Sequence, residues 1–283
     1  MIKYIDWGQH LRLGNYLFLY AGINNIVYRS GNELVLPDYY AWKYMVNPPK
    51  IDNDKSYDEI FHLFKDDNIA KTMDNYVKYF TENKDKVINI NLGSHLQSEK
   101  WFIDNIDYIK TKLLIKQDEI DKVKNKYSDF FNKPTIGIGI RLGDFINHGV
   151  FYQIPFDWYT KALVNEFPNY QDYNVIVFSD DIEHAKKIFK DWNFLYAEPN
   201  GTHTHKDNFI HYHKDPMEQF ILASQMSNFI GGSSTFSWWN MWYIKNFNNG
   251  KVVHSNKNLS VAGEKEHGTN KDYYPESWTL FNV

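Results

Sequence analysis

Residues 134–144 read PTIGIGIRLGD, and the clearest fold signal in the chain lies in this stretch. The apolar run 135–140 has the length and composition of a strand buried on both faces, which is typical of a parallel sheet. An amphipathic helix is predicted at 157–167 and a second apolar strand at 174–178. A strand, a helix and another strand in this order predict a right-handed crossover, and therefore a parallel α/β sheet.

The alternation of strands and helices continues in both directions. Toward the C-terminus it predicts helices at 182–192, 216–225 and 235–244 and strands at 194–197, 228–232 and 251–254. Toward the N-terminus it predicts a strand at 4–7, a glycine-flanked loop at 8–14, a helix at 15–28, strands at 33–36 and 87–90, helices at 99–114 and 117–130, and irregular structure at 38–86. We therefore expect two domains, 1–133 and 134–283, with a C-terminal tail that can cross back over the first domain.

The composition restricts the class of protein and its partners. Because none of the 283 residues is cysteine, a disulfide framework and a cysteine metal site are both excluded, which suits a cytoplasmic protein. A net charge of −4 and a pI near 6.3 do not fit a nucleic-acid-binding protein. The first residues do not resemble a signal peptide and no apolar run is long enough for a transmembrane anchor, so we expect at most a peripheral membrane association.

Arginine is unusually rare in this chain. Arg12, Arg29 and Arg141 are the only arginines among 31 basic residues. A guanidinium group offers a planar, two-pronged set of donors that matches a phosphate, whereas a lysine ammonium is a point charge. Arg12 and Arg141 both lie beside glycines, at a turn or at the end of a predicted strand. They are therefore the first candidates for phosphate binding.

Three strands of the second half end in polar residues. The strand 135–140 runs into Arg141, Gly143 and Asp144, the strand 174–178 runs into Ser179, Asp180 and Asp181, and the strand 228–232 runs into Ser233, Ser234, Thr235, Phe236 and Ser237. In a parallel sheet these ends meet at the carboxyl edge, where ligands of open α/β sheets bind. Helix N-termini at that edge favour anions, so a diphosphate is the expected ligand.

Each of these strand ends also has a purely structural interpretation. Asp180 with Glu183 has the spacing of a helix capping box. The serines of 233–237 can cap the helix that follows them. Arg141 can be one partner of a buried salt bridge, and Asp144 can hold Arg141 in place. Gly14-Asn15 can likewise mark no more than a helix start, with Asn15 as its cap.

Six segments, in order along the chain, resemble the motifs of one family. They are RLGNYLFLYA at 12–21, NLGSHLQSEK at 91–100, IGIRLGDF at 138–145, FSDD at 178–181, the run 217–239 that ends in SSTFSWW, and YPESW at 274–278. Together they resemble glycosyltransferase family 11, the α-1,2-fucosyltransferases. The chain differs from the family pattern at Gly139, where the family has histidine, at Leu142, where a second arginine is common, and at Tyr16, where the family has glutamine.

The resemblance implies an α/β fold of the GT-B type, with two Rossmann-like domains and a donor-binding cleft between them. It implies an inverting, metal-independent transfer of L-fucose from GDP-fucose to the 2-hydroxyl of an acceptor sugar, usually galactose. The partners would be a nucleotide sugar and an acceptor glycan, with no metal and no further cofactor. The change at Gly139 and Leu142 leaves open a related transferase with another nucleotide sugar. The aromatic content of 18% leaves open an inactive, lectin-like sugar-binding protein.

The resemblance also assigns roles to residues. Arg141 binds the β-phosphate and offsets the charge of the leaving group, Gly143 lets the backbone approach, Ser234 and Thr235 bind the phosphates, and Asp180 or Asp181 orients the nucleoside. From the first domain, Arg12, Gly14 and Asn15 would reach across the cleft. The full expected donor-binding set is Arg12, Gly14, Arg141, Gly143, Ser179, Asp180, Asp181, Ser233, Ser234, Thr235, Phe236 and Ser237, and the expected catalytic set is Arg141, Asp144 and Asn15.

Two further patterns suggest a metal site, and neither is convincing. Asp180 and Asp181 are adjacent and lie at a helix start, unlike the spaced carboxylates of a metal-binding D-x-D motif. His203, His205, His211 and His213 lie in a polar loop rich in Gly, Asn and Lys. We interpret that loop as a segment at the cleft rather than a metal site, and no metal ligand is predicted.

Overall fold

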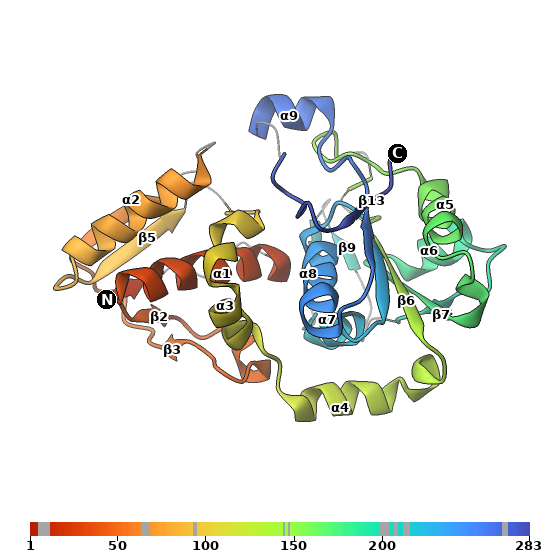
Figure 1. The fold of residues 1–283 in the computed structure, drawn as a ribbon, viewed down its shortest axis with the longest axis horizontal. Coiled ribbons are helices and arrows are strands. Elements are labelled where there is room, and N and C mark those ends of the chain that lie inside the picture. The colour runs from red at the N-terminus through yellow and green to blue at the C-terminus, as the bar shows by residue number, and fades with distance from the viewer. Residues whose placement is uncertain are drawn as a thin grey trace. The chain divides into compact units, whose positions relative to one another are not determined.

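The computed structural model of the chain describes residues 1–4, 12–63, 68–92, 95–143, 145–146, 148–198, 204–206, 209–211, 216–267 and 271–283. The chain forms two compact units, Met1–Lys116 and Gln117–Val283, which are described separately below (Figure 1). Each unit is built on its own parallel sheet. This is the α/β architecture that the alternating pattern predicts.

The second unit contains a six-stranded sheet in the order β13-β12-β11-β6-β7-β8, and every neighbouring pair is parallel. Its strands are β6 (Thr135–Ile140), β7 (Asn174–Ser179), β8 (Leu195–Tyr196), β11 (Asn228–Gly231), β12 (Val252–His254) and β13 (Thr279–Leu280). A short antiparallel hairpin joins β9 (Thr204–Lys206) to β10 (Phe209–His211). The end of the chain thus completes the second sheet, since β13 pairs with β12.

The helices of this unit cover both faces of its sheet (Figure 1). The elements are α4 (Gln117–Lys126), η4 (Ser128–Phe131), α5 (Phe156–Glu166), η5 (Tyr170–Asp172), α6 (Ile182–Ile188), α7 (Met217–Ser224), α8 (Thr235–Tyr243), the π-helix η6 (Ile244–Asn248) and α9 (Val261–His267). Helices α5 and α6 lie on one face, and α7 and α8 lie on the other. Right-handed crossovers require this, because the chain moves outward from β6 in one direction and then in the other.

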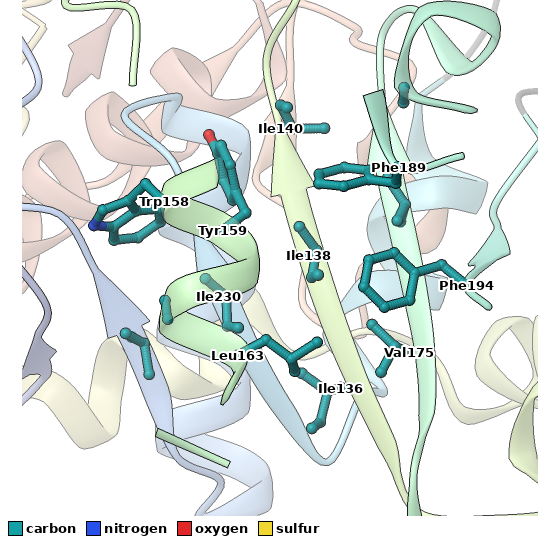
Figure 2. Packing of buried hydrophobic residues seen from close by; sticks show 14 of the residues in the cluster. Ile136, Ile138, Ile140, Trp158, Tyr159, Leu163, Val175, Phe189, Phe194 and Ile230 are labelled. Atoms are coloured by element: carbon teal, nitrogen blue, oxygen red, sulfur yellow. The ribbon is translucent and has the colours of Figure 1, made fainter. Parts of the chain in front are cut away.

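Strand β6 is the centre of the buried core. Its isoleucines Ile136, Ile138 and Ile140 are at most 3% exposed, and they join Leu163 of α5 and Phe189 in one apolar cluster (Figure 2). The glycines between them face the other side, where the ring of Phe229 lies. This alternation of isoleucine and glycine explains why β6 is buried along its whole length.

The first unit contains a five-stranded parallel sheet in the order β3-β2-β1-β5-β4. Its elements are β1 (Ile2–Lys3), α1 (Leu13–Ser30), β2 (Leu34–Leu36), η1 (Trp42–Tyr44), β3 (Lys50–Ile51), β4 (Glu59–Leu63), α2 (Ile69–Glu82), β5 (Ile88–Leu92), η2 (Glu99–Trp101), η3 (Ile103–Asn105) and α3 (Ile106–Leu113). The helices α1 and α2 pack against each other. This follows from topology, because the steps from β1 to β2 and from β4 to β5 run in the same direction along the sheet.

Local sequence signals account for the ends of α1 and for a helix in a stretch predicted to be irregular. Gly31 adopts φ 65°, the left-handed conformation that ends many helices, so α1 stops after Ser30. The region 38–86 is not irregular, since it contains β3, β4 and α2. The side chain of Asn68 caps α2, and residues at helical spacing, such as Met73, Tyr76 and Phe80, bury one face of it.

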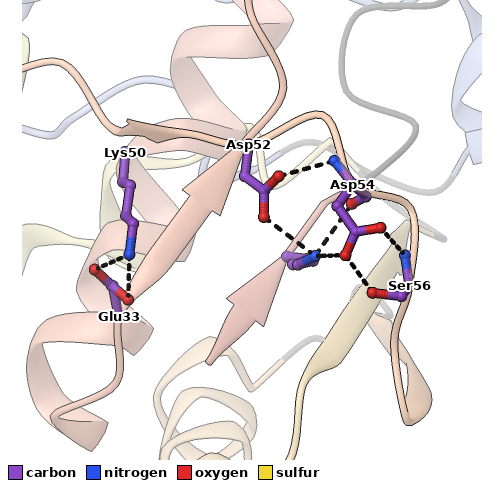
Figure 3. A network of polar contacts seen from close by, with 6 residues as sticks. Glu33, Lys50, Asp52, Asp54 and Ser56 are labelled. Carbon is purple, nitrogen blue, oxygen red and sulfur yellow. Dashed lines mark hydrogen bonds and ion pairs between the residues drawn. The ribbon is translucent and has the colours of Figure 1, made fainter.

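A polar network ties two strand ends of the first sheet together (Figure 3). Lys3 of β1 is buried, and its ammonium lies 3.1 Å from a carboxylate oxygen of Asp54 and 3.4 Å from one of Asp52. Burial lowers the pKa of Lys3, but its contacts with the two carboxylates outweigh this and raise it overall. Hydrogen bonds from Ser56 and Lys3 in turn lower the pKa of Asp54 to about 2. The network is structural, because every group in it already has a partner within the sheet edge.

The boundary between the units lies at Lys116, earlier than the expected position near residue 133. Helix α4 and the following turn belong to the second unit because their side chains bind α7. The ammonium of Lys126 lies 2.7 Å from a carboxylate oxygen of Glu218, and the Tyr127 hydroxyl donates to the same carboxylate at 2.8 Å. A sequence boundary drawn at Pro134 misses these contacts, because they join residues more than 90 positions apart.

Candidate functional site

The strand order of the second sheet reverses between β6 and β11. The chain proceeds from β6 outward to β7 and β8, and then returns to place β11 and β12 on the other side of β6. Ligands of open α/β sheets bind at the carboxyl edge of such a reversal. Arg141 follows β6 and Gly232 follows β11, and the N–H of Gly232 donates to the Gly139 carbonyl at 3.1 Å. The topology thus brings the two predicted phosphate-binding segments next to each other.

Arg141 is held by a carboxylate from the next strand. One Nη of Arg141 lies 3.2 Å from Oδ2 of Asp180, and the guanidinium carbon lies 5.8 Å from the centre of the Phe145 ring. The Arg141 side chain remains 15% exposed, whereas that of Asp180 is 3% exposed. The same Asp180 carboxylate accepts hydrogen bonds from the backbone N–H groups of Leu142 and Gly143, both at 2.9 Å. The salt-bridge interpretation of Arg141 is therefore correct, and 15% of the Arg141 side chain remains exposed.

The other residues of this strand end have local roles. Asp181, and not Asp180, caps α6, since its carboxylate accepts from the His184 N–H at 3.0 Å. The capping box predicted for Asp180 with Glu183 is therefore wrong, because the capping residue is Asp181, one position later. The Ser179 hydroxyl accepts from the Asp181 N–H at 3.1 Å. Asp180 and Asp181 are thus both bound by the chain's own backbone.

The segment after β11 forms the start of helix α8. Ser234 is the cap, because its hydroxyl accepts from the Ser237 N–H at 3.1 Å, and the same hydroxyl donates to that of Ser237 at 3.0 Å. Both serines are buried, whereas Ser233, Thr235 and Phe236 are half-buried. The capping interpretation therefore holds for Ser234, and the groups left for a ligand are Ser233, Thr235 and the first N–H groups of the helix.

Two tyrosines of the C-terminal tail hold the turn before α8. The hydroxyl of Tyr274 donates to the Gly232 carbonyl at 3.4 Å, and that of Tyr273 donates to the Ser233 carbonyl at 3.3 Å. Burial raises the pKa of both phenols, which keeps them protonated as donors. In a trans peptide the N–H points opposite to the carbonyl, so the N–H groups of Ser233 and Ser234 point away from the tyrosines. These tyrosines are absent from the predicted site, although Tyr274 begins the YPESW segment.

His254 supports this arrangement from the end of β12. Its ring stacks on that of Tyr274 with centroids 4.1 Å apart, and its Nδ1 donates to the Ser255 carbonyl at 2.8 Å. Burial lowers the pKa of His254, so the imidazole is neutral at neutral pH and carries its remaining lone pair on Nε2. The stack therefore positions Tyr274 without adding a charge beside the strand ends.

Gly139, which stands where the family has histidine, lies in a place too narrow for a larger side chain. A Cβ at Gly139 would overlap Ser237 Oγ and would lie 2.9 Å from Cε1 of Phe229. Ser237 cannot easily move, because its hydroxyl accepts from that of Ser234. The close approach of β6 and α8 thus requires glycine in this chain.

We expect Gly139→Ala to lower the free energy of unfolding by about 1–3 kcal/mol, the usual cost of an overpacked core. Thermal unfolding checks this. Equal melting temperatures for wild type and Gly139→Ala would contradict the tight packing of β6 against α8.

In the first unit, the predicted residues lie at the start of α1. Arg12 occupies the cap position, and Asn15 is the third residue of the helix, so the interpretation of Asn15 as the cap is wrong. The Asn15 side-chain oxygen accepts from the Gln97 amide at 2.8 Å. Gln97 follows Leu96, which has φ 50° although it is not glycine, and such strain is stored most often at functional positions. The 91–100 motif and the 12–21 motif thus meet at the carboxyl edge of the first sheet.

Some predicted residues lie outside the described part of the chain. They are Asp144, His203 and His213, and the side chains of His205 and His211 are likewise not described. Among the described residues, no group of three or more His, Cys, Asp or Glu side chains is arranged to hold a metal ion. No helix in the described ranges is both long enough and apolar enough to span a bilayer.

Comparison with known protein families matches residues 47–282 to glycosyl transferase family 11. The chain belongs to this family. It is therefore a glycosyltransferase, and the resemblance noted in the sequence is confirmed over that range. The match does not include the 12–21 motif, for which the resemblance rests on the segment itself.

One curated relative supports the same class of enzyme. Over 118 residues the chain is 29% identical to the O-antigen biosynthesis glycosyltransferase WbnK of Escherichia coli. The match covers 39% of this chain and 35% of that protein, so the chain matches about a third of the length of its relative.

Three solved structures share the fold at low sequence identity. The apo form of POFUT1 has a TM-score of 0.58 at 11% identity and covers 89% of this chain and 96% of its own. NodZ α-1,6-fucosyltransferase soaked with GDP-fucose has a TM-score of 0.54 at 11% identity, covering 93% and 96%. A mutant of Arabidopsis thaliana FUT1 in complex with GDP has a TM-score of 0.52 at 12% identity, covering 89% and 69%. These likenesses confirm the GT-B fold with its two Rossmann-like units.

Proposed function

We propose that this glycosyltransferase transfers L-fucose from GDP-fucose to a hydroxyl of an acceptor sugar. The observation that carries the proposal is the position of Arg141 beside the start of α8 at the strand reversal. A guanidinium and a helix N-terminus together favour a diphosphate. Three proteins with this fold are described as complexes with GDP or GDP-fucose, which supports GDP as the nucleotide.

Arg141 and the start of α8 assist the proposed reaction by stabilising the negative charge that develops on the leaving group. As the bond between the sugar C1 and the phosphate oxygen breaks, negative charge develops on the β-phosphate of GDP. The Arg141 guanidinium and the N–H groups at the start of α8 stabilise that charge in place. The new bond forms between C1 and the acceptor oxygen on the opposite face of the sugar, which inverts the anomeric centre. We assign the 2-hydroxyl of galactose as acceptor and Asp144 as the group that takes its proton.

The first unit would supply the acceptor side, through Arg12, Gly14 and Asn15. The relation to an O-antigen glycosyltransferase supports an acceptor glycan that is part of a surface polysaccharide. The absence of cysteine suits a reducing compartment, and we place the reaction in the cytoplasm. Because Arg141 and the N–H groups at the start of α8 stabilise the charge of the leaving group, the proposed transfer needs no metal ion.

A thermal-shift panel of GDP, UDP and CMP tests the donor. Among the three nucleotides we expect GDP alone to raise the melting temperature, because only a ligand that binds the native state stabilises it. At one hundred times its Kd, such a ligand contributes about 2.7 kcal/mol. We expect chelators to leave fucosyl transfer unchanged. Stabilisation by UDP or CMP instead would replace GDP-fucose as the donor, no stabilisation by any nucleotide would favour a lectin-like protein, and a strict need for Mn²⁺ or Mg²⁺ would overturn the metal-free reaction.

A further inference from the structure

The side chain of Asp180 is nearly buried at the candidate site, and three groups contact its carboxylate. Its Oδ1 accepts from the Leu142 N–H, and its Oδ2 accepts from the Gly143 N–H and faces the Arg141 guanidinium. Its side chain is 3% exposed, and three groups of the β6 strand end share its two oxygens. Little of this carboxylate is therefore exposed to a bound nucleotide.

The partners of Asp180 define what it can do. Asp180 follows β7, and Ser179 pairs with Ile140 in the parallel register, so the two strand ends are adjacent. Two successive backbone N–H groups and one guanidinium edge converge on the carboxylate from the neighbouring strand. This arrangement sets both the path of the backbone after β6 and the direction of the Arg141 side chain.

The charge of Asp180 argues against a direct role in binding. A carboxylate beside a diphosphate is repulsive, and it also offsets part of the positive charge of Arg141. A guanidinium has five N–H donors, more than the single Asp180 carboxylate can bind. A buried carboxylate is tolerable because it is paired and hydrogen-bonded. Asp180 therefore orients the Arg141 side chain, and at the same time it weakens the attraction between Arg141 and the diphosphate.

We propose that Asp180 is a positioning residue, which holds the Arg141 guanidinium in the direction that meets the diphosphate. This inference rests on the proposed function, in which Arg141 binds the diphosphate. The alternative contact, a carboxylate that orients the nucleoside, would need an accessible carboxylate, whereas the Asp180 side chain is only 3% exposed. Asparagine cannot replace Asp180, since its NH₂ group would meet either a backbone N–H or the guanidinium, both of which are donors.

The scarcity of arginine makes the test direct. With three arginines in the chain, the ¹⁵N spectrum of the arginine side chains contains three sets of signals, and Arg141→Lys identifies one of them. In the ligand-free wild type we expect slow rotation of the Arg141 guanidinium, because Asp180 binds one edge of it. A freely rotating Arg141 guanidinium would overturn the proposal without any Asp180 variant.

Variants then separate positioning from contact and from simple support of the fold. We expect Asp180→Asn to raise the Kd for GDP at least about tenfold, a change of about 1.4 kcal/mol. In an Arg141→Ala background the same change should alter the Kd less than about threefold, because Asp180 acts through Arg141. Glu166→Gln is the control, since it removes a partly buried carboxylate whose partner, Lys251, lies 2.8 Å away at the amino end of β12.

Each outcome of these measurements supports or overturns the positioning role of Asp180. Multiplicative losses in the double variant would mean that Asp180 acts independently of Arg141, by direct contact or through the 142–143 backbone, and would overturn the proposal. A lower melting temperature with unchanged GDP affinity, as expected for Glu166→Gln, would reduce Asp180 to a structural residue. If the wild type binds another nucleotide in place of GDP, the donor assignment fails, and the same cycle with that nucleotide still tests Asp180. A wild type that binds no nucleotide would overturn both proposals.

Discussion

Replacing Arg141 with lysine should lower kcat/KM by at least about tenfold, which corresponds to about 1.4 kcal/mol of transition-state stabilisation. The structure explains why so similar a residue should fail. The Arg141 guanidinium already binds Asp180 at 3.2 Å along one edge and lies over the Phe145 ring. It can serve a phosphate at the same time only because its donors point in several fixed directions. A lysine ammonium drawn to Asp180 would be lost to the diphosphate.

Steady-state kinetics and GDP affinity, measured on the folded variant, check this expectation. Arg29→Lys is the matched control, because Arg29 forms an exposed ion pair with Asp74 in the first unit and has no assigned role. We expect that variant to behave as the wild type, since exposed pairs contribute little. Kinetics close to wild type in a folded Arg141→Lys protein would remove Arg141 from the mechanism.

Asn15→Ala should lower kcat/KM for transfer about tenfold while leaving GDP affinity within about twofold, the size expected when one hydrogen bond to a reacting group is lost. The Asn15 oxygen accepts from Gln97 at 2.8 Å, which directs the amide N–H₂ of Asn15 away from Gln97. That group can donate to an oxygen of the sugar or acceptor. Gln97→Ala should produce a smaller loss in the same direction, because it frees Asn15 to rotate.

The Asn15 prediction needs a control for helix stability. Asn68→Ala supplies it, since Asn68 caps α2 through its hydrogen bond from the Lys71 N–H at 3.1 Å. Loss of such a cap costs about 1 kcal/mol of stability and should leave transfer unchanged. If Asn15→Ala instead resembles Asn68→Ala, with a lower melting temperature and normal turnover, then Asn15 only supports α1 and the site does not extend to it.

Several features of the fold follow from short-range patterns. The strand prediction at 135–140 agrees with β6 residue for residue, and helix and strand positions in the second half agree within a few residues at most ends. Such agreement is expected, because hydrophobic period, glycine and caps act over a few residues. The same signals were present for α2, where apolar residues recur at helical spacing after Asn68, but aromatic and charged neighbours concealed them.

Much of the candidate site also follows from the order of strands and loops. A parallel sheet places successive strand ends on one edge, so Arg141, Asp180 and the start of α8 were expected to be neighbours. Because arginine is rare in this chain, the composition by itself indicates Arg141 as a candidate phosphate ligand. Residues and topology together thus predicted where a diphosphate would bind and which cation would meet it.

Tertiary structure alone decided how these residues divide their work. Which aspartate caps α6 and which holds Arg141 depends on strand register, and the Asp180 contact joins residues 38 positions apart. The tyrosines that direct the turn before α8 come from 40 residues further along the chain. The sequence by itself determined the alternation of strands and helices and the polar strand ends, because both depend on neighbours along the chain. The partners of each polar group depend on segments that only folding brings together, and these the structure had to show.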